Sequence, residues 1–190
     1  MTNPIAVFNE WLAEAREAGV AVPEAMTVAT ADAAGRPSAR MLLLKGADEN
    51  GFTFFSGYDS RKGRELDENP HAALVFYWQP LGRQVRVEGT VRRLPPEASD
   101  EYWATRPPRS RAAAAASRQS SPIEDLSALE TEAERLLAEN EGDVPRPERW
   151  GGYVLEPGVI ELWQHRDDRL HDRIRFTRAR EGWVAERLAP

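Results

Sequence analysis

The 190-residue chain contains no cysteine, which excludes disulfide bonds, thiolate catalysis and cysteine-ligated metal sites. It also lacks any run that approaches the ~18 apolar residues needed for a membrane-spanning helix. Its first residues, MTNPIAVFNEW, have neither the basic start nor the apolar core of a secretory signal peptide. We therefore expect a cytoplasmic protein that has no membrane partner.

Positive charges are fewer than negative ones: the chain has 25 Lys and Arg residues against 31 Asp and Glu residues, which gives a net charge of −6. This balance gives no bulk attraction to nucleic acid, so any basic site must be local. Only two of the 25 basic residues are lysines, Lys45 and Lys62. Either these two positions require the compact ammonium group of lysine, or lysine occurs there by chance in a chain that otherwise uses arginine. The sequence leaves both interpretations open.

The common catalytic motifs are also missing. The three histidines, His71, His165 and His171, show neither HxH nor HExxH spacing, so we expect no metal site. The chain has no GxGxxG, GxxxxGK[ST] or GxSxG motif, which argues against Rossmann, P-loop and common hydrolase sites.

The hydrophobic pattern predicts a mainly β protein with helical insertions. Asn3 and Pro4 are typical of a helix start, and Gly19 is typical of its end. Short connections between the strands favour antiparallel pairing. The expected strands cover residues 25–32, 37–46, 51–57, 71–78, 83–94, 151–157, 158–164, 169–178 and 182–188. We expect a single domain over 1–190, with a helical insert at about 95–140 in which Ser121–Glu124 forms a capping box.

Two stretches place cations where they need an explanation. Ser60 is expected to cap a short helix whose first turn carries Arg61 and Lys62, although cations are unfavourable at that end of a helix. The stretch DDRLHDR, residues 167–173, places Arg169, His171 and Arg173 on one face if it is a strand, with Leu170 toward the core. Either water or a bound anion could satisfy these charges.

Polar side chains suited to a phosphorylated, planar, heteroaromatic ligand recur at the ends of the predicted elements. Arg and Lys suit phosphate, Gln suits ring nitrogens and oxygens, and Trp and Tyr supply flat surface. Taken singly, each of these residues is more often a surface or capping residue.

Five blocks in order resemble one family. IELWQHRDDRLHDRIRF resembles the C-terminal signature of the pyridoxine/pyridoxamine 5′-phosphate oxidase family. The blocks ARMLLLKG, SRKGRELDENP, WQPLGRQVRVEG and YWATRPPRSRAAAAASRQSS are similar to the family as well. The resemblance implies an FMN-binding, antiparallel split β-barrel that forms a homodimer with the flavin at the subunit interface.

The resemblance also implies the site residues, each at a position matching a family motif. The residues expected to contact FMN are Arg40, Met41, Leu42, Leu43, Leu44, Lys45, Phe55, Ser56, Arg61, Lys62, Gln84, Gln119, Ser120, Trp163 and Arg173. Those expected to contact the substrate are Lys45, Tyr102, Arg106, Ser110, Arg169, Leu170 and His171. Arg169 and His171, expected against the pyridine ring, are the catalytic candidates.

The implied reaction is oxidation of pyridoxamine or pyridoxine 5′-phosphate by O2 to pyridoxal 5′-phosphate, with H2O2 and, from the amine, ammonia. Two departures weaken the substrate assignment: the chain begins almost at the first helix, without the family's N-terminal extension, and Phe55 replaces a Tyr. A related FMN-dependent oxidase of phenazine precursors is one alternative. A non-catalytic protein that binds flavin or pyridoxal phosphate is another.

Overall fold

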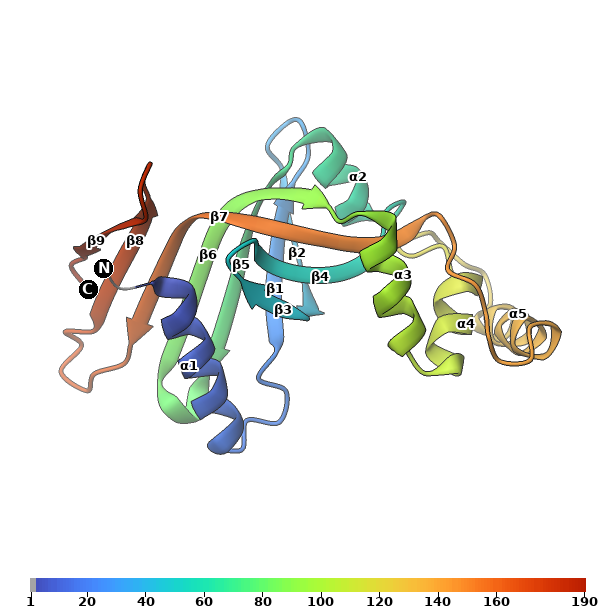
Figure 1. The fold of residues 1–190 in the computed structure, drawn as a ribbon, viewed down its shortest axis with the longest axis horizontal. Helices are drawn as coiled ribbons and strands as arrows, with labels where there is room; N and C mark the ends of the chain where they lie inside the picture. Colours follow the sequence, from blue (N-terminus) through green and yellow to red (C-terminus); the bar gives the residue numbers. More distant parts are fainter. Residues whose placement is uncertain (1–2) are drawn as a thin grey trace.

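The computed structural model describes residues 3–190, so the first two residues of the expected domain lie outside the described residues. Its centre is an antiparallel half-barrel (Figure 1), in which the strands pair in the order β2-β1-β5-β6-β7-β4-β3 and β8 and β9 continue from β7. The strands are β1 (Ala25–Ala31), β2 (Pro37–Leu43), β3 (Gly46–Asp48), β4 (Gly51–Gly57), β5 (His71–Trp78), β6 (Arg83–Arg93), β7 (Trp150–Gln164), β8 (Asp172–Arg178) and β9 (Trp183–Arg187). The mainly β fold with antiparallel pairing is therefore confirmed.

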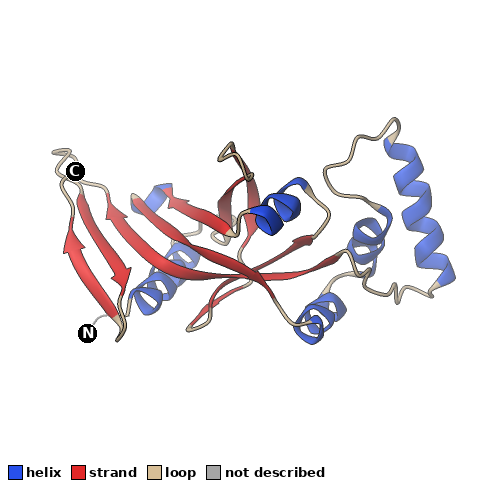
Figure 2. Ribbon diagram, turned by 90° about the horizontal axis from the view of Figure 1, so that it is seen from above, coloured by secondary structure: helices blue, strands red, loops and turns tan. Residues whose placement is uncertain are grey.

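The helices are α1 (Pro4–Glu17), α2 (Arg61–Glu68), α3 (Pro96–Thr105), α4 (Pro108–Ala116) and α5 (Leu126–Glu139), with a 3-10 turn at Gln79–Leu81. Helix α1 closes the core, since the Phe8 ring lies 5.0 Å from that of Phe52 and 4.9 Å from that of Phe76. Helices α3–α5 lie at one end of the molecule and β8 and β9 at the other (Figures 1 and 2). Within residues 3–190, no helix has the length and apolar character needed to cross a membrane.

Strand β7 is continuous, whereas the sequence predicted two strands over 151–157 and 158–164. Pro157 pairs with Gly89 where the register of β6 shifts between Glu88 and Gly89, which is a β-bulge. Proline is tolerated at bulges because its missing N–H is not needed there. The pairing of β6 with β7 therefore continues on both sides of Pro157 and Gly158, where the sequence predicted a break between two strands.

Helix α5 begins four residues later than the predicted capping box. Asp125 is the N-cap, and its Oδ1 accepts a hydrogen bond from the Ser127 N–H at 2.9 Å. Ser and Asp are comparably good N-caps, so the sequence could not choose between Ser121 and Asp125. Ile123, which was predicted to lie in the helix, precedes it and is exposed.

The predicted strand over 169–178 is wrong at its start, because β8 begins at Asp172. Arg169 has a left-handed φ of 61°, and the Asp168 carboxylate accepts a hydrogen bond from the Leu170 N–H. These are the features of a turn closed by an aspartate side chain. Leu170 is 62% exposed and does not reach the core as predicted.

Candidate functional site

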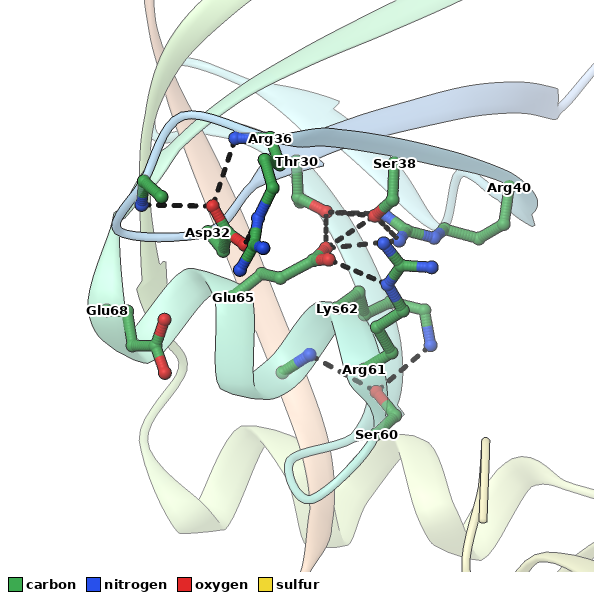
Figure 3. Close-up of polar contacts among 12 residues, drawn as sticks. Thr30, Asp32, Arg36, Ser38, Arg40, Ser60, Arg61, Lys62, Glu65 and Glu68 are labelled. Carbon is green, nitrogen blue, oxygen red and sulfur yellow. Dashed lines mark hydrogen bonds and ion pairs between the residues drawn. The ribbon is translucent and has the colours of Figure 1, made fainter. Parts of the chain in front are cut away.

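The buried ammonium group of Lys62 belongs to a polar cluster at the start of α2 (Figure 3). Ser60 caps α2 as predicted, and its hydroxyl accepts a hydrogen bond from the Gly63 N–H at 3.2 Å. Lys62 folds back over this cap, donating to the Ser56 hydroxyl at 2.8 Å and to Gln119 Oε1 at 3.1 Å. Burial lowers the pKa of Lys62 to about 8. Its partners in these bonds are neutral oxygens, which leaves its charge available to an anion.

Arg40 and Arg61 lie beside Lys62, and both are held by Glu65. Arg40 comes from β2 and approaches Glu65 Oε2 at 3.3 Å, while Arg61 Nε donates to Glu65 Oε1 at 2.9 Å. Arg61 precedes Glu65 by one helical turn, the spacing at which opposite charges meet on a helix. The three cations and one carboxylate leave the cluster with an excess of positive charge.

A cavity of about 380 Å³, which we call the cation cavity, opens on this cluster. Its walls are Ser38, Ala39, Arg40, Met41, Leu42, Arg61, Lys62, Gln119 and Ser120. Three cationic side chains around one cavity suit a phosphate group. Ser56 lies behind the wall, as a partner of Lys62.

A second cavity of about 450 Å³, the tyrosine cavity, shares Met41 and Leu42 with the first. Its walls are Met41, Leu42, Leu43, Lys45, Phe55, Tyr102, Arg106, Pro107, Ser110 and Trp150. The structure thus brings together four predicted residues from different elements. Lys45 follows β2, Tyr102 lies in α3, Arg106 caps the end of α3, and Ser110 lies in α4. Leu44 is 4% exposed and packs in the core, so its side chain lines neither cavity.

Aromatic rings hold the polar groups of the tyrosine cavity. The Tyr102 ring stacks on Phe55 with centroids 3.9 Å apart. The Arg106 guanidinium lies 4.6 Å from the centre of the Trp150 ring, and Arg106 Nη2 donates to the Ser110 carbonyl at 3.0 Å. Burial lowers the pKa of Arg106, and among residues 3–190 no carboxylate forms an ion pair with it. Arg106 is therefore a second cation without a counter-charge.

The remaining predicted residues lie elsewhere, on the open face of β6, β7 and β8. Gln84 pairs with Trp163, and Trp163 pairs with Arg173, so the three form a row across the strands that we call the sheet row. Arg173 Nε donates to the buried carboxylate of Glu161 at 2.8 Å. The linings of both cavities come from other parts of the chain.

The two catalytic candidates lie next to the sheet row. The His171 ring is 4.7 Å from that of Trp163, and His171 Nδ1 accepts a hydrogen bond from the Arg166 N–H. Arg169 is exposed on the turn before β8. The turn before β8 and the helices α3 and α4, which carry Tyr102 and Ser110, lie toward opposite ends of the fold (Figure 1), so one subunit does not bring all the predicted residues together.

Sequence reasoning missed the residues that support the predicted ones. Glu65 holds two arginines, Trp150 faces Arg106, and Glu161 holds Arg173. The four-residue spacing of Arg61 and Glu65 could have revealed that pair. The contacts of Trp150 and Glu161 join separate elements, so no local pattern predicts them.

Fold and site together define an antiparallel half-barrel protein with two neighbouring cation-lined cavities. Residues 12–139 match the family model described as pyridoxamine 5′-phosphate oxidase, and residues 150–190 match that of the pyridoxine 5′-phosphate oxidase C-terminal dimerisation region. The chain belongs to the pyridoxamine 5′-phosphate oxidase family, as the sequence resemblance indicated.

Individual relatives agree on the fold but differ in the compounds that their names carry. Pyridoxine/pyridoxamine 5′-phosphate oxidases from Paraburkholderia phymatum and Salinibacter ruber are 52% and 50% identical, each over 99% of this chain and 89% of the relative. The crystal structure of PhzG from Burkholderia lata, in complex with tetrahydrophenazine-1-carboxylic acid, superposes with a TM-score of 0.96 at 37% identity, covering 100% of this chain and 94% of that one. A pyridoxamine 5′-phosphate oxidase-related, FMN-binding protein from Nostoc punctiforme shares the fold, with a TM-score of 0.77 at 18% identity and coverage of 95% and 96%.

Proposed function

We propose that this protein is an FMN-dependent oxidase that converts pyridoxamine 5′-phosphate, and pyridoxine 5′-phosphate, to pyridoxal 5′-phosphate with O2 as the acceptor. The observation that carries the proposal is the pair of cation-lined cavities that share a wall of β2. Two phosphorylated molecules whose planar rings react with each other require two phosphate sites on either side of a common space. The names of the relatives support the same reaction.

The cation cavity fits the phosphate of FMN. Arg40, Arg61 and Lys62 supply the charge, and within residues 3–190 the buried Lys62 ammonium has no carboxylate partner of its own, which suits a dianionic ligand. Met41, Leu42 and Leu43 would face the flavin, and Gln119 and Ser120 would close the site. The remaining proposed FMN ligands are Lys45, Phe55, Ser56, Gln84, Trp163, Arg173 and Leu44, of which Leu44 could contribute only its backbone because its side chain packs in the core.

The tyrosine cavity would take the phosphate of the substrate through Lys45, Tyr102, Arg106 and Ser110. When bound, FMN would supply hydride acceptance and the passage of electrons to O2. The protein groups would orient the substrate ring, with Arg169 and His171 against it and Leu170 beside them. Ring placement matters because hydride transfer requires close, well-aligned partners.

We further propose that the functional unit is a homodimer with the flavin at its interface. The sheet row and the catalytic candidates lie far from the cavities within one chain, and a second subunit could supply them. The match of residues 150–190, which include Trp163 and Arg173, to the family's dimerisation region supports this arrangement.

A phenazine-precursor oxidase is the second candidate, favoured by the close superposition on PhzG. Tricyclic phenazine precursors carry a carboxylate and no phosphate. Four polar groups around the tyrosine cavity, two of them cationic, suit a phosphate better. A non-catalytic flavin or pyridoxal-phosphate carrier would need the same cavities but no oxidation.

Reduction of the bound flavin separates these functions. The purified chain is reconstituted with FMN and mixed anaerobically with pyridoxamine 5′-phosphate. We expect the absorbance of oxidised flavin to bleach and to return with O2. Flavin that stays oxidised with both B6 substrates but bleaches with a dihydrophenazine carboxylate would favour the second candidate. Flavin that binds and stays oxidised with all of them would favour the carrier.

A further inference from the structure

Glu65 is a carboxylate buried behind the cation cavity. It lies on α2, is 6% exposed, and receives hydrogen bonds from two strands and its own helix (Figure 3). Its Oε2 accepts from the Thr30 hydroxyl at 2.5 Å and the Ser38 hydroxyl at 2.6 Å, while Oε1 accepts from Arg61 Nε. Glu65 is absent from the wall of the cavity, so its influence on a ligand would pass through the residues it touches.

Arg40 is the main residue through which Glu65 could act. Arg40 Nη1 donates to the Thr30 hydroxyl at 2.6 Å, and Nη2 donates to the Ser38 hydroxyl. Each hydroxyl has a single proton, and here both protons point to Glu65 while the oxygen lone pairs face Arg40. The carboxylate thus sets the direction of two hydrogen bonds that fix the Arg40 guanidinium.

We propose that Glu65 is the positioning residue of the cation cavity, orienting Arg40 and Arg61 so that the site recognises a phosphate monoester. The inference rests on the proposed FMN-binding function and adds a residue that contacts neither phosphate nor flavin. The Glu65 carboxylate bonds to Arg40 of β2 and to Arg61 of α2, and so fixes the two sides of the cavity relative to each other.

The role requires a carboxylate and not merely a polar group of the same shape. Burial alone would raise the pKa of Glu65, but hydrogen bonds from Ser38, Thr30, Arg61 and Arg40 lower it to about 2, so the group stays ionised. A glutamine there would have one amide NH2 in place of an acceptor oxygen. That NH2 would face either the Arg61 Nε–H or the two hydroxyl protons, and one set of donors would lose its acceptor.

The test compares Glu65→Gln with the wild type in fluorescence titrations of the apoprotein with FMN and with riboflavin, which lacks the phosphate. We expect the Kd for FMN to rise about tenfold or more, because charge-assisted hydrogen bonds are lost, while the Kd for riboflavin changes less than about twofold. The selectivity for FMN over riboflavin therefore falls. General damage to the fold would weaken both ligands and leave this ratio unchanged, which would overturn the inference.

Two further variants complete the test. Thr30 is buried and lies outside the cavity wall, and Thr30→Val keeps the shape of its side chain. The substitution removes one of the two hydroxyls that connect Glu65 to Arg40, so we expect a smaller loss of the selectivity for FMN over riboflavin. Glu68→Gln makes the same chemical change at an exposed position of α2 and should leave both Kd values unchanged. Unchanged or tighter FMN binding by Glu65→Gln would overturn the inference, since charge removal alone strengthens anion binding. A wild type that binds FMN no better than riboflavin would overturn the proposed function itself.

Discussion

Lys62 shows how burial can make the proposed phosphate ligand of the cation cavity sensitive to pH. Lys62 is 3% exposed, and burial, assisted by the nearby charge of Arg40, lowers its pKa from 10.5 to about 8. Below that pH, Lys62 of the free protein already carries the proton. Above it the proton is lost from the free protein, and a bound phosphate would draw it back by favouring the ammonium form.

We therefore expect FMN affinity to be nearly constant from pH 7 to about 8 and then to fall by up to tenfold per pH unit. In Lys62→Met the fall above pH 8 should disappear, and affinity at pH 7 should be lower by about 10- to 100-fold. Fluorescence titration across this range measures both effects. Arg64→Met, an exposed cation on the same helix, is the matched control and should keep the wild-type profile. A wild-type profile that stays flat to pH 9 would contradict the prediction.

The identities of the cationic residues could be predicted from the sequence, but their environment could not. Arg61 and Lys62 stand out at the start of a short helix, where positive charge is unfavourable. That Lys62 is buried, and that Glu65 also holds Arg40, follows from the packing of α2 against β1 and β2. Contacts between residues 25 positions apart, such as Arg40 and Glu65, leave no local pattern.

At the scale of elements, strand β7 stays continuous through a β-bulge at Gly158, which is skipped where Glu88 pairs with Val159 and Gly89 pairs with Pro157. Gly89 lies opposite the bulge, so close to β7 that a Cβ atom there would be 2.0 Å from the Glu156 carbonyl oxygen. A backbone oxygen within a ladder has little freedom to move. The glycine therefore permits the long strand that carries Trp150 at one end and Trp163 at the other.

We expect Gly89→Ala to lower the free energy of unfolding by about 2–3 kcal/mol, through overpacking against the backbone. Gly158→Ala is the control on the facing strand, where a Cβ would lie 3.8 Å from the Glu88 carbonyl oxygen in ordinary contact. Urea unfolding followed by circular dichroism compares the two variants. Equal stability of both would show that the backbone contact at Gly89 tolerates a side chain.

Most elements follow from periodicity, and the errors share a physical cause. The ends of α1 are marked by Asn3 and Gly19, and both marks are local. The start of α5, the continuity of β7 and the turn before β8 each depend on what the neighbouring chain offers. Local signals were present at each place, but more than one conformation satisfied them.

At the scale of the whole molecule, the division of the predicted residues leads to a test of the proposed dimer. In the proposed two-fold symmetric dimer, each site takes Arg106 from one subunit and Arg169 from the other. A heterodimer of Arg106→Ala and Arg169→Ala chains would then place both substitutions in one site and leave the other site intact. Each variant alone should lose activity by orders of magnitude. A heterodimer purified with two different tags should retain about half of the wild-type activity. Activity no higher than that of the single variants would show that each site lies within one chain.

The sequence by itself determined the family, the antiparallel β class and the kinds of side chain available to a ligand. These follow from motifs and periodicities that lie within short stretches of chain. Only the tertiary structure decided which of those side chains meet. It joined β2, α2 and α4 around two cavities, buried Lys62 and Glu65, and left Gln84, Trp163 and Arg173 on a separate face. The reason is that charge, burial and hydrogen-bond direction are properties of contacts between distant segments, which only the folded chain defines.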